Sequence, residues 1–120
     1  MISSEEGLRI LRNWKTKKTL LWFVSRETSD MALGLRNVRV AEVSTEPLGV
    51  VFRFEGSEEI ESLDLEGADF DIAGAGESPF PDVPSKKFSR FMYLYLSDGR
   101  NFVLAEYAMG ESADDKPVLP

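Results

Sequence analysis

The sequence predicts a mainly β fold (α+β by count of elements). In this fold an N-terminal helix precedes a strongly bent five- to six-stranded antiparallel sheet, or a small barrel. Apolar residues recur at helical spacing near the N-terminus, whereas from Thr19 onward short apolar runs are separated by turn-forming residues. The chain has 120 residues, 42% of them hydrophobic, which is enough for one packed core. We therefore expect a single domain over residues 1–108.

The N-terminal segment carries the signals of a capped helix. Ser3 or Ser4 can act as the N-cap, and Glu6 follows Ser3 at the spacing of a capping box. The apolar positions that recur at helical spacing are Leu8, Leu11 and Trp14. This apolar stripe predicts that the helix packs on the sheet, because about three turns are marginal in isolation.

The next segments predict three strands, the second of them long and irregular. Residues 20–24 are apolar at every position, which favours a strand covered on both faces. Within residues 31–43 the apolar positions change parity twice, so we expect bulges or a sharp bend near Gly34. A turn at residues 46–49 leads into a third strand, where Val50, Phe52 and Phe54 alternate with mostly polar residues.

The following segment is interpreted as one strand with a bulge. Leu63 and Leu65 have odd parity, whereas Phe70 and Ile72 have even parity, and a glycine bulge at Gly67 explains the change. Residues 73–87, rich in glycine and proline, predict a long loop inside the domain. Residues 109–120 predict a flexible tail.

The clearest local signal is a hairpin near the C-terminus. Residues 88–96 and 101–107 are two strand-like runs, and the turn between them contains Asp98-Gly99. We therefore predict a tight antiparallel hairpin at this place.

This order of elements resembles the Sm-like small β-barrel, a relative of SH3-like barrels, over residues 3–72 and 88–107. RNA-binding members of that family carry an Asp-Asn signature in the third loop and an Arg-Gly step near the last strand. The corresponding loop here, residues 45–49, has no Asn, and the chain has no Arg-Gly dipeptide. The resemblance therefore implies a barrel and a tendency to self-associate, and it implies no site residues.

Composition restricts the chemistry that the chain can perform. It contains no His and no Cys, which excludes imidazole bases, thiol nucleophiles, and metal sites built on either residue. We find no catalytic motif and predict a protein that is not an enzyme and has no cofactor. No apolar run approaches the length of a membrane span, and residues 1–6 lack the basic start of a secretion signal, so we expect a cytoplasmic protein.

Charge is distributed unevenly along the chain. Residues 1–40 hold eight basic and four acidic side chains, whereas residues 41–120 hold six and seventeen. Residues 55–82 contain ten acids and no base. This asymmetry predicts two unlike surfaces that attract a basic partner or another copy of the chain. The alternative is that the acids serve solubility alone.

Two groups of residues are candidate sites. Glu66, Asp69 and Asp71 supply oxygen ligands of the kind that Ca²⁺ or Mg²⁺ prefers, although their spacing does not fit a calcium loop, and the alternative is a polar strand edge. The second group is an aromatic set that is a candidate for binding a protein partner, or for cover within the chain. It consists of Phe80 in the proline-rich loop and Phe91, Tyr93, Tyr95 and Tyr107 on the predicted hairpin.

The leading functional hypothesis is a non-enzymatic domain that acts in protein–protein association, as a homo-oligomer or an adaptor. The first alternative is binding of a small ligand or a divalent cation by the acidic strand region. The second is weak nucleic-acid binding by the helix, whose basic residues are Arg9, Arg12, Lys15, Lys17 and Lys18. We consider nucleic acid an improbable partner, because the rest of the chain is acidic, and we expect no membrane contact.

Overall fold

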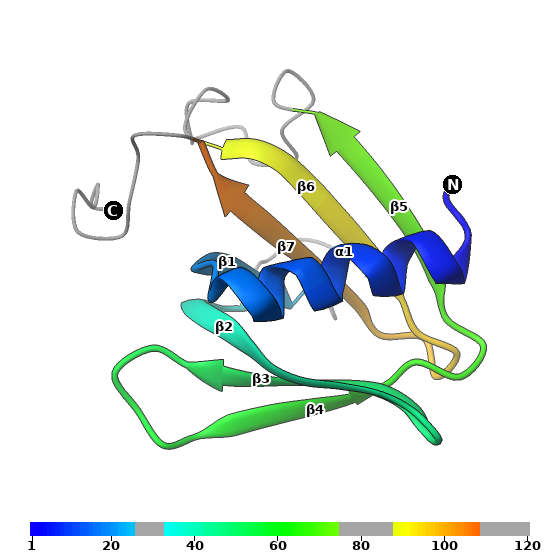
Figure 1. The fold of residues 1–120 in the computed structure, drawn as a ribbon, viewed down its shortest axis with the longest axis horizontal. Helices are drawn as coiled ribbons and strands as arrows, with labels where there is room; N and C mark the ends of the chain where they lie inside the picture. The colour runs from blue at the N-terminus through cyan, green and yellow to red at the C-terminus, as the bar shows by residue number, and fades with distance from the viewer. Residues whose placement is uncertain (26–32, 75–87, 109–120) are drawn as a thin grey trace.

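The structure, a computed structural model, describes residues 1–25, 33–74 and 88–108 (Figure 1). One helix precedes seven strands that form a single antiparallel sheet in the order β4-β3-β2-β1-β7-β6-β5. The elements are α1 (Ser4–Lys17), β1 (Leu21–Ser25), β2 (Leu33–Thr45), β3 (Leu48–Phe54), β4 (Ile60–Asp64), β5 (Asp69–Gly74), β6 (Phe88–Tyr95) and β7 (Asn101–Tyr107). The predicted mainly β fold with an N-terminal helix is confirmed.

Helix α1 begins and ends at caps that its sequence explains. The Ser3 hydroxyl accepts a hydrogen bond from the Glu6 backbone N–H at 3.1 Å, so Ser3 rather than Ser4 is the N-cap. Lys18 ends the helix in the left-handed conformation, with φ of 53°, and its N–H bonds to the Lys15 carbonyl at 3.2 Å. The predicted capped helix is confirmed.

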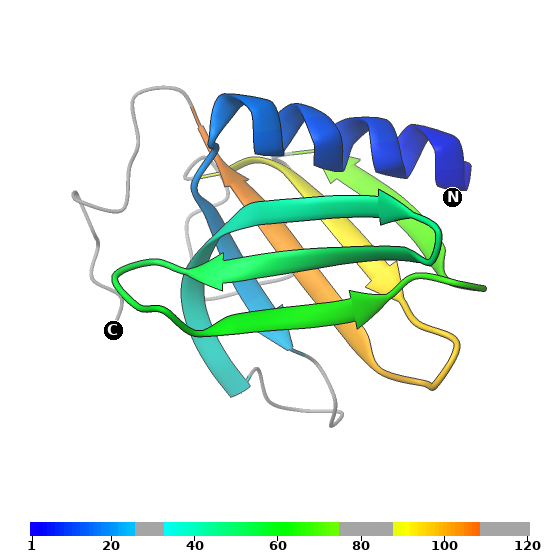
Figure 2. The same ribbon diagram turned by 60° about the horizontal axis from the view of Figure 1, so that its bottom comes forward.

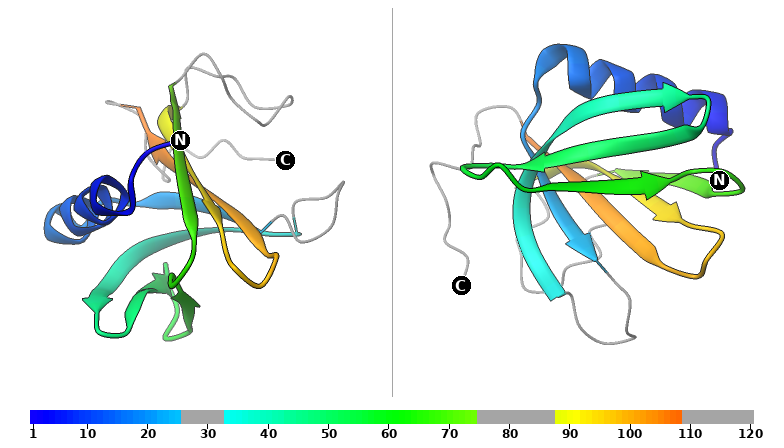
Figure 3. Two further views of the ribbon diagram at one scale, coloured as in Figure 1. Left: turned by 90° about the vertical axis from the view of Figure 1, so that its right-hand side faces the viewer. Right: turned by 90° about the horizontal axis from the view of Figure 1, so that it is seen from below.

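The sheet is open, which corrects the expectation of a barrel of five to six strands. Strands β4 and β5 lie at the two ends of the sheet and are not paired with each other. A turn at residues 65–68 connects them, and from this turn the two halves of the sheet diverge, with α1 in the opening between them (Figure 3). The helix contacts both β2 and β5, so it packs against both halves of the sheet.

The strand predicted over residues 63–72 does not exist as one element. Leu63 belongs to β4, Phe70 belongs to β5, and Gly67 lies in the turn between them with φ of 74°. A turn and a bulge produce the same change of parity in the sequence. The turn forms here because the chain passes from one edge of the sheet to the other.

The predicted irregularity of the second strand is confirmed. The register between β2 and β3 shifts between Val40 and Glu42, and the register between β1 and β2 shifts where Phe23 pairs with Arg36 and Ser25 with Leu33. The second shift places residues 34 and 35 of β2 opposite the single residue 24 of β1, so β2 has one extra residue there. These two bulges let β2 bend between the halves of the sheet.

The hairpin of β6 and β7 is also confirmed. The Leu96 N–H donates to the Arg100 carbonyl at 2.9 Å, and Gly99 in the turn has φ of 96°. Only glycine adopts such a backbone without strain. Strand β7 then pairs with β1, which joins the two halves of the sheet.

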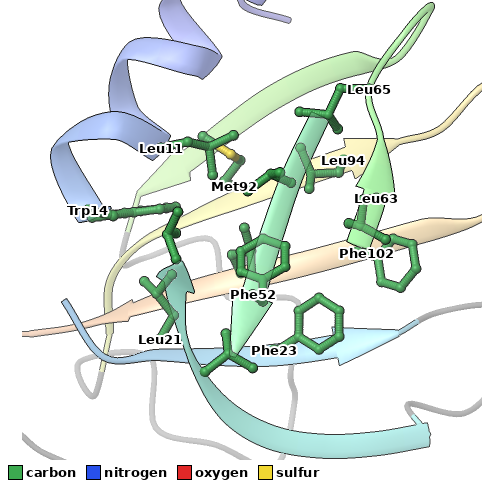
Figure 4. Close-up of a cluster of buried hydrophobic side chains, with 14 of the residues drawn as sticks. Leu11, Trp14, Leu21, Phe23, Phe52, Leu63, Leu65, Met92, Leu94 and Phe102 are labelled. Carbon is green, nitrogen blue, oxygen red and sulfur yellow. The ribbon is translucent and has the colours of Figure 1, made fainter. Parts of the chain in front are cut away.

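One large apolar core fills the space between α1 and the inner face of the sheet (Figure 4). All seven strands and the helix contribute to it, and Trp14 and Phe52 are among its fully buried side chains. The helix lies very close to β5 at Gly7. A Cβ atom at this position would lie 2.3 Å from the Phe70 ring, so only glycine permits this approach.

A second, smaller core lies on the outer face of β1, β7 and β6, away from the helix. Trp22 and Phe88 stack there with ring centroids 5.1 Å apart, and Val103 and Ala105 are fully buried beside them. Strand β1 is therefore covered on both faces, as its apolar sequence predicts.

No helix in the described part of the chain is long and apolar enough to span a membrane. The predicted loop lies outside the described residues from position 75 onward, and the predicted tail lies outside them entirely. The single-domain boundary at residue 108 stays a prediction.

Candidate functional site

The aromatic residues proposed for partner binding differ in their accessibility. Phe91 is fully buried in the outer-face core, so it offers no surface to a partner. Tyr93 is half-buried, and its ring stacks on that of Tyr95 at 6.3 Å with an interplanar angle of 7°. Tyr95 is 37% exposed. Phe80 lies outside the described residues.

Tyr107, the last member of this set, has a structural hydrogen bond. Its hydroxyl donates to Asn37 Oδ1 at 2.6 Å, which ties β7 to β2 across the outer face of β1. Burial raises the pKa of Tyr107, and the hydrogen bond to Asn37 opposes that shift. Of the four predicted aromatic residues that are described, Tyr95 is the most exposed to solvent.

The three predicted cation ligands do not form one site. Asp69 and Asp71 alternate with core residues along β5 and share its outer face, whereas the Glu66 carboxylate accepts a hydrogen bond from the Leu48 N–H at 3.4 Å. The N-terminal ammonium lies 3.1 Å from Asp71 and, together with the Ile72 N–H, lowers the pKa of this carboxyl. Within the described ranges, no three acidic side chains are grouped so as to hold a metal ion.

The predicted basic surface exists on α1. Arg12, Lys15, Lys17 and Lys18 are exposed there, whereas Arg9 forms an ion pair with Glu6. The hydrogen bond from Arg9 lowers the pKa of Glu6. These bases follow the outer side of a helix whose opposite side is in the core, the pattern of an ordinary solvated helix.

Strand β4 presents a feature that the sequence analysis missed: it is an edge strand, and among the described residues no further strand pairs with its outer side (Figure 2). The Phe54 N–H donates to the Glu59 carbonyl at 3.1 Å, and the Leu65 N–H to the Leu48 carbonyl at 3.0 Å. The antiparallel register between these bonds directs the backbone groups of every second residue toward β3. The backbone N–H and C=O of the intervening residues, Ile60, Ser62 and Asp64, therefore point away from the sheet.

The side chains of this edge combine one apolar residue with several acids. Ile60 is 55% exposed, which makes it the most exposed large apolar side chain of the described strands. The acids of β4 and its flanking turns, none of them buried, are Glu58, Glu59, Glu61, Asp64 and Glu66. We use the term β4 edge for residues 58–66. The acid-rich run was visible in the sequence, but its position at a sheet edge depends on strand order.

An open pocket of about 460 Å³ lies at one end of the β4 edge. Gly49 lies between Ser44 and Asp64 on neighbouring strands, and all three residues line the pocket. The Ser44 hydroxyl donates to the Pro47 carbonyl at 2.6 Å, and the Asp64 carboxylate accepts from the Glu66 N–H at 3.0 Å. These two polar groups already have hydrogen-bond partners within the chain. The pocket is therefore a hollow beside the edge and not a site with a reactive group.

The β4 edge is thus an edge strand that combines an exposed apolar side chain, several acids and an adjoining pocket. Comparison with protein-family models, curated proteins and solved structures finds no match to this chain.

Proposed function

We propose that the protein is a non-enzymatic domain that acts by protein–protein association, as an adaptor or a homo-oligomer, and that the β4 edge is the surface it uses. One observation carries this proposal: the sheet is open, and no strand of the described residues pairs with the outward backbone groups of β4, which lie beside the exposed Ile60. Backbone groups of this kind are a template for pairing with another chain. The absence of His and Cys from the sequence supports a binding role over a catalytic one.

The aromatic outer face supports the same function less strongly. Phe91 is fully buried and Tyr107 is bonded to Asn37, so both contribute to packing within the chain. Among the described residues of the aromatic set, Tyr95 alone is substantially exposed to solvent. The β4 edge is therefore the stronger candidate surface.

Site-specific photo-crosslinking tests the proposed function. A photoreactive phenylalanine analogue replaces Ile60 in cells that naturally express the protein, and the matched control places the same analogue at Arg12 on the exposed side of α1. We expect a discrete protein adduct at position 60, identified by mass spectrometry, and none at position 12. Adducts that do not differ between the two positions would contradict the proposal.

Light scattering of the purified chain at micromolar concentration then separates the two forms of the proposal. A mass above that of one chain supports the homo-oligomer, and the mass of a single chain supports the adaptor.

A further inference from the structure

We infer that the β4 edge binds an extended, basic segment of another protein, which adds to the sheet as a further strand. This inference rests on the proposed function and specifies the class of partner. Addition of a strand to a free sheet edge is a common mode of peptide recognition, in which the main chain provides affinity and alternate side chains provide specificity.

The backbone of β4 offers a regular set of hydrogen-bonding groups for such a segment. Ile60, Ser62 and Asp64 each direct an N–H and a C=O away from β3, because the residues between them use theirs in the β3–β4 ladder. All three residues are exposed to solvent. An added strand can therefore pair along the full length of β4.

The side chains of the edge select the charge of the partner. Glu59 and Glu61 alternate with Ile60 and Ser62 along the strand, so the two faces of an added strand meet different surroundings. Basic residues on one face would pair with Glu59 and Glu61 across the new ladder, where opposite charges are favourable. Apolar residues on the other face would contact Ile60.

Charge also disfavours the β4 edge of a second copy of this chain as the occupant. The β4 edge, residues 58–66, holds five acids and no base, so pairing of two β4 edges would bring ten carboxylates together. Like charges on neighbouring strands are destabilising. The same acids that attract a basic segment therefore protect the edge from self-pairing, a common way to prevent aggregation of sheets.

The test uses a short, capped, fluorescent peptide of alternating lysine and valine, with binding measured by fluorescence anisotropy at low salt. One control peptide replaces lysine with glutamate. A second keeps the lysines but carries N-methyl groups on alternate residues, which removes backbone donors on one side of the strand. We expect saturable binding of the lysine–valine peptide, no binding of the glutamate peptide, and at least roughly tenfold weaker binding of the N-methylated peptide.

Two matched protein variants locate the site. Glu59→Lys/Glu61→Lys reverses two charges at β4, and Glu5→Lys/Asp69→Lys reverses two exposed charges on α1 and on β5, the opposite edge. We expect a loss of about tenfold or more from the β4 variant and a much smaller loss from its control, since both have the same net charge. Circular dichroism checks that each variant is folded. The measurements with the two control peptides use the unaltered protein, so they do not depend on whether the variants fold.

Several results would overturn the inference. Equal binding of the N-methylated peptide would show attraction by charge alone, and equal losses in the two variants would show that β4 is not the site. Crosslinks at position 60 without peptide binding would leave the association function standing and refute strand addition by a basic segment. Peptide binding without crosslinks in the cell would instead contradict the proposed function.

Discussion

At Gly7 the absence of a side chain allows helix α1 to pack closely against Phe70 of β5. Alanine stabilises an isolated helix by about 1 kcal/mol relative to glycine. Here the added Cβ would lie 2.3 Å from a carbon of the buried Phe70 ring. At this residue, helix propensity therefore favours alanine, whereas packing against the sheet favours glycine. We expect the packing effect on stability to be the larger of the two.

We predict that Gly7→Ala lowers the free energy of unfolding by about 1–3 kcal/mol, the usual cost of overpacking a core. Chemical denaturation measures this change. Thr16→Ala, at an exposed position of the same helix, is the control and should stay within about 0.5 kcal/mol of the parent. A Gly7→Ala variant as stable as the parent would contradict the close contact.

Tyr107 predicts an alkaline dependence of stability. Because burial raises its pKa in the folded state, the neutral phenol contributes stability that is fully present below the unfolded value of about 10 and is lost as pH rises through the folded value. Denaturation midpoints measured across this pH range should show a fall that is weaker in Tyr107→Phe. The exposed Tyr95→Phe is the control and should retain the fall of the parent. Identical profiles for all three proteins would contradict this assignment.

Among the elements, the β6–β7 hairpin and helix α1 were predictable because their signals are local. The Asp98-Gly99 pair specifies a turn through backbone conformation, and Ser3 with Glu6 specifies a helix start through one hydrogen bond. The β4–β5 connection was not predictable in the same way. A change of parity at Gly67 fits a bulge or a turn equally well, and distant partners decide between them.

The hairpin turn provides a test at the level of an element. Gly99 has a positive φ, which costs an alanine about 1–2 kcal/mol. Gly74, at the end of β5, does not have a positive φ, and no atom lies within 4 Å of the position that an alanine Cβ would occupy there. We therefore predict that Gly99→Ala lowers the melting temperature, whereas Gly74→Ala leaves it unchanged or raises it slightly because the unfolded chain loses entropy. Equal effects of the two substitutions would contradict the turn geometry.

At the scale of the whole molecule, the sequence predicted an uneven charge distribution but not the surface that carries it. The acids of residues 58–66 form one exposed edge because β4 is the last strand of the sheet. The three predicted cation ligands separated for a similar reason, since Glu66 lies in a turn that bonds to β3 while Asp69 and Asp71 belong to β5. Strand order is a property of long-range pairing, and a single sequence does not encode it locally.

The stability of the fold at acidic pH depends on carboxyl groups in distant parts of the molecule. The backbone N–H and the guanidinium of Arg100 hold the pKa of Asp98 below its ordinary value, and Arg9 does the same for Glu6. Depressed carboxyl pKa values contribute stability that is present above the unfolded values of about 4 and is lost as pH falls through the folded ones. We predict a melting temperature that falls in this acidic range and falls less steeply in Asp98→Asn, since the amide keeps an oxygen for the Arg100 N–H. Parallel curves would contradict this contribution.

The strand order has a further consequence for how the chain folds. Strands β1 to β4 pair in sequence order, as do β5 to β7, so each half is a meander built from neighbouring hairpins. Among the described strands, the seam between β1 and β7 is the one pairing of strands that are distant in the sequence, with Leu21 opposite Glu106. Closing a long loop is slow compared with forming hairpins. The β1–β7 seam is therefore the strand pairing that carries the largest cost of loop closure in this sheet.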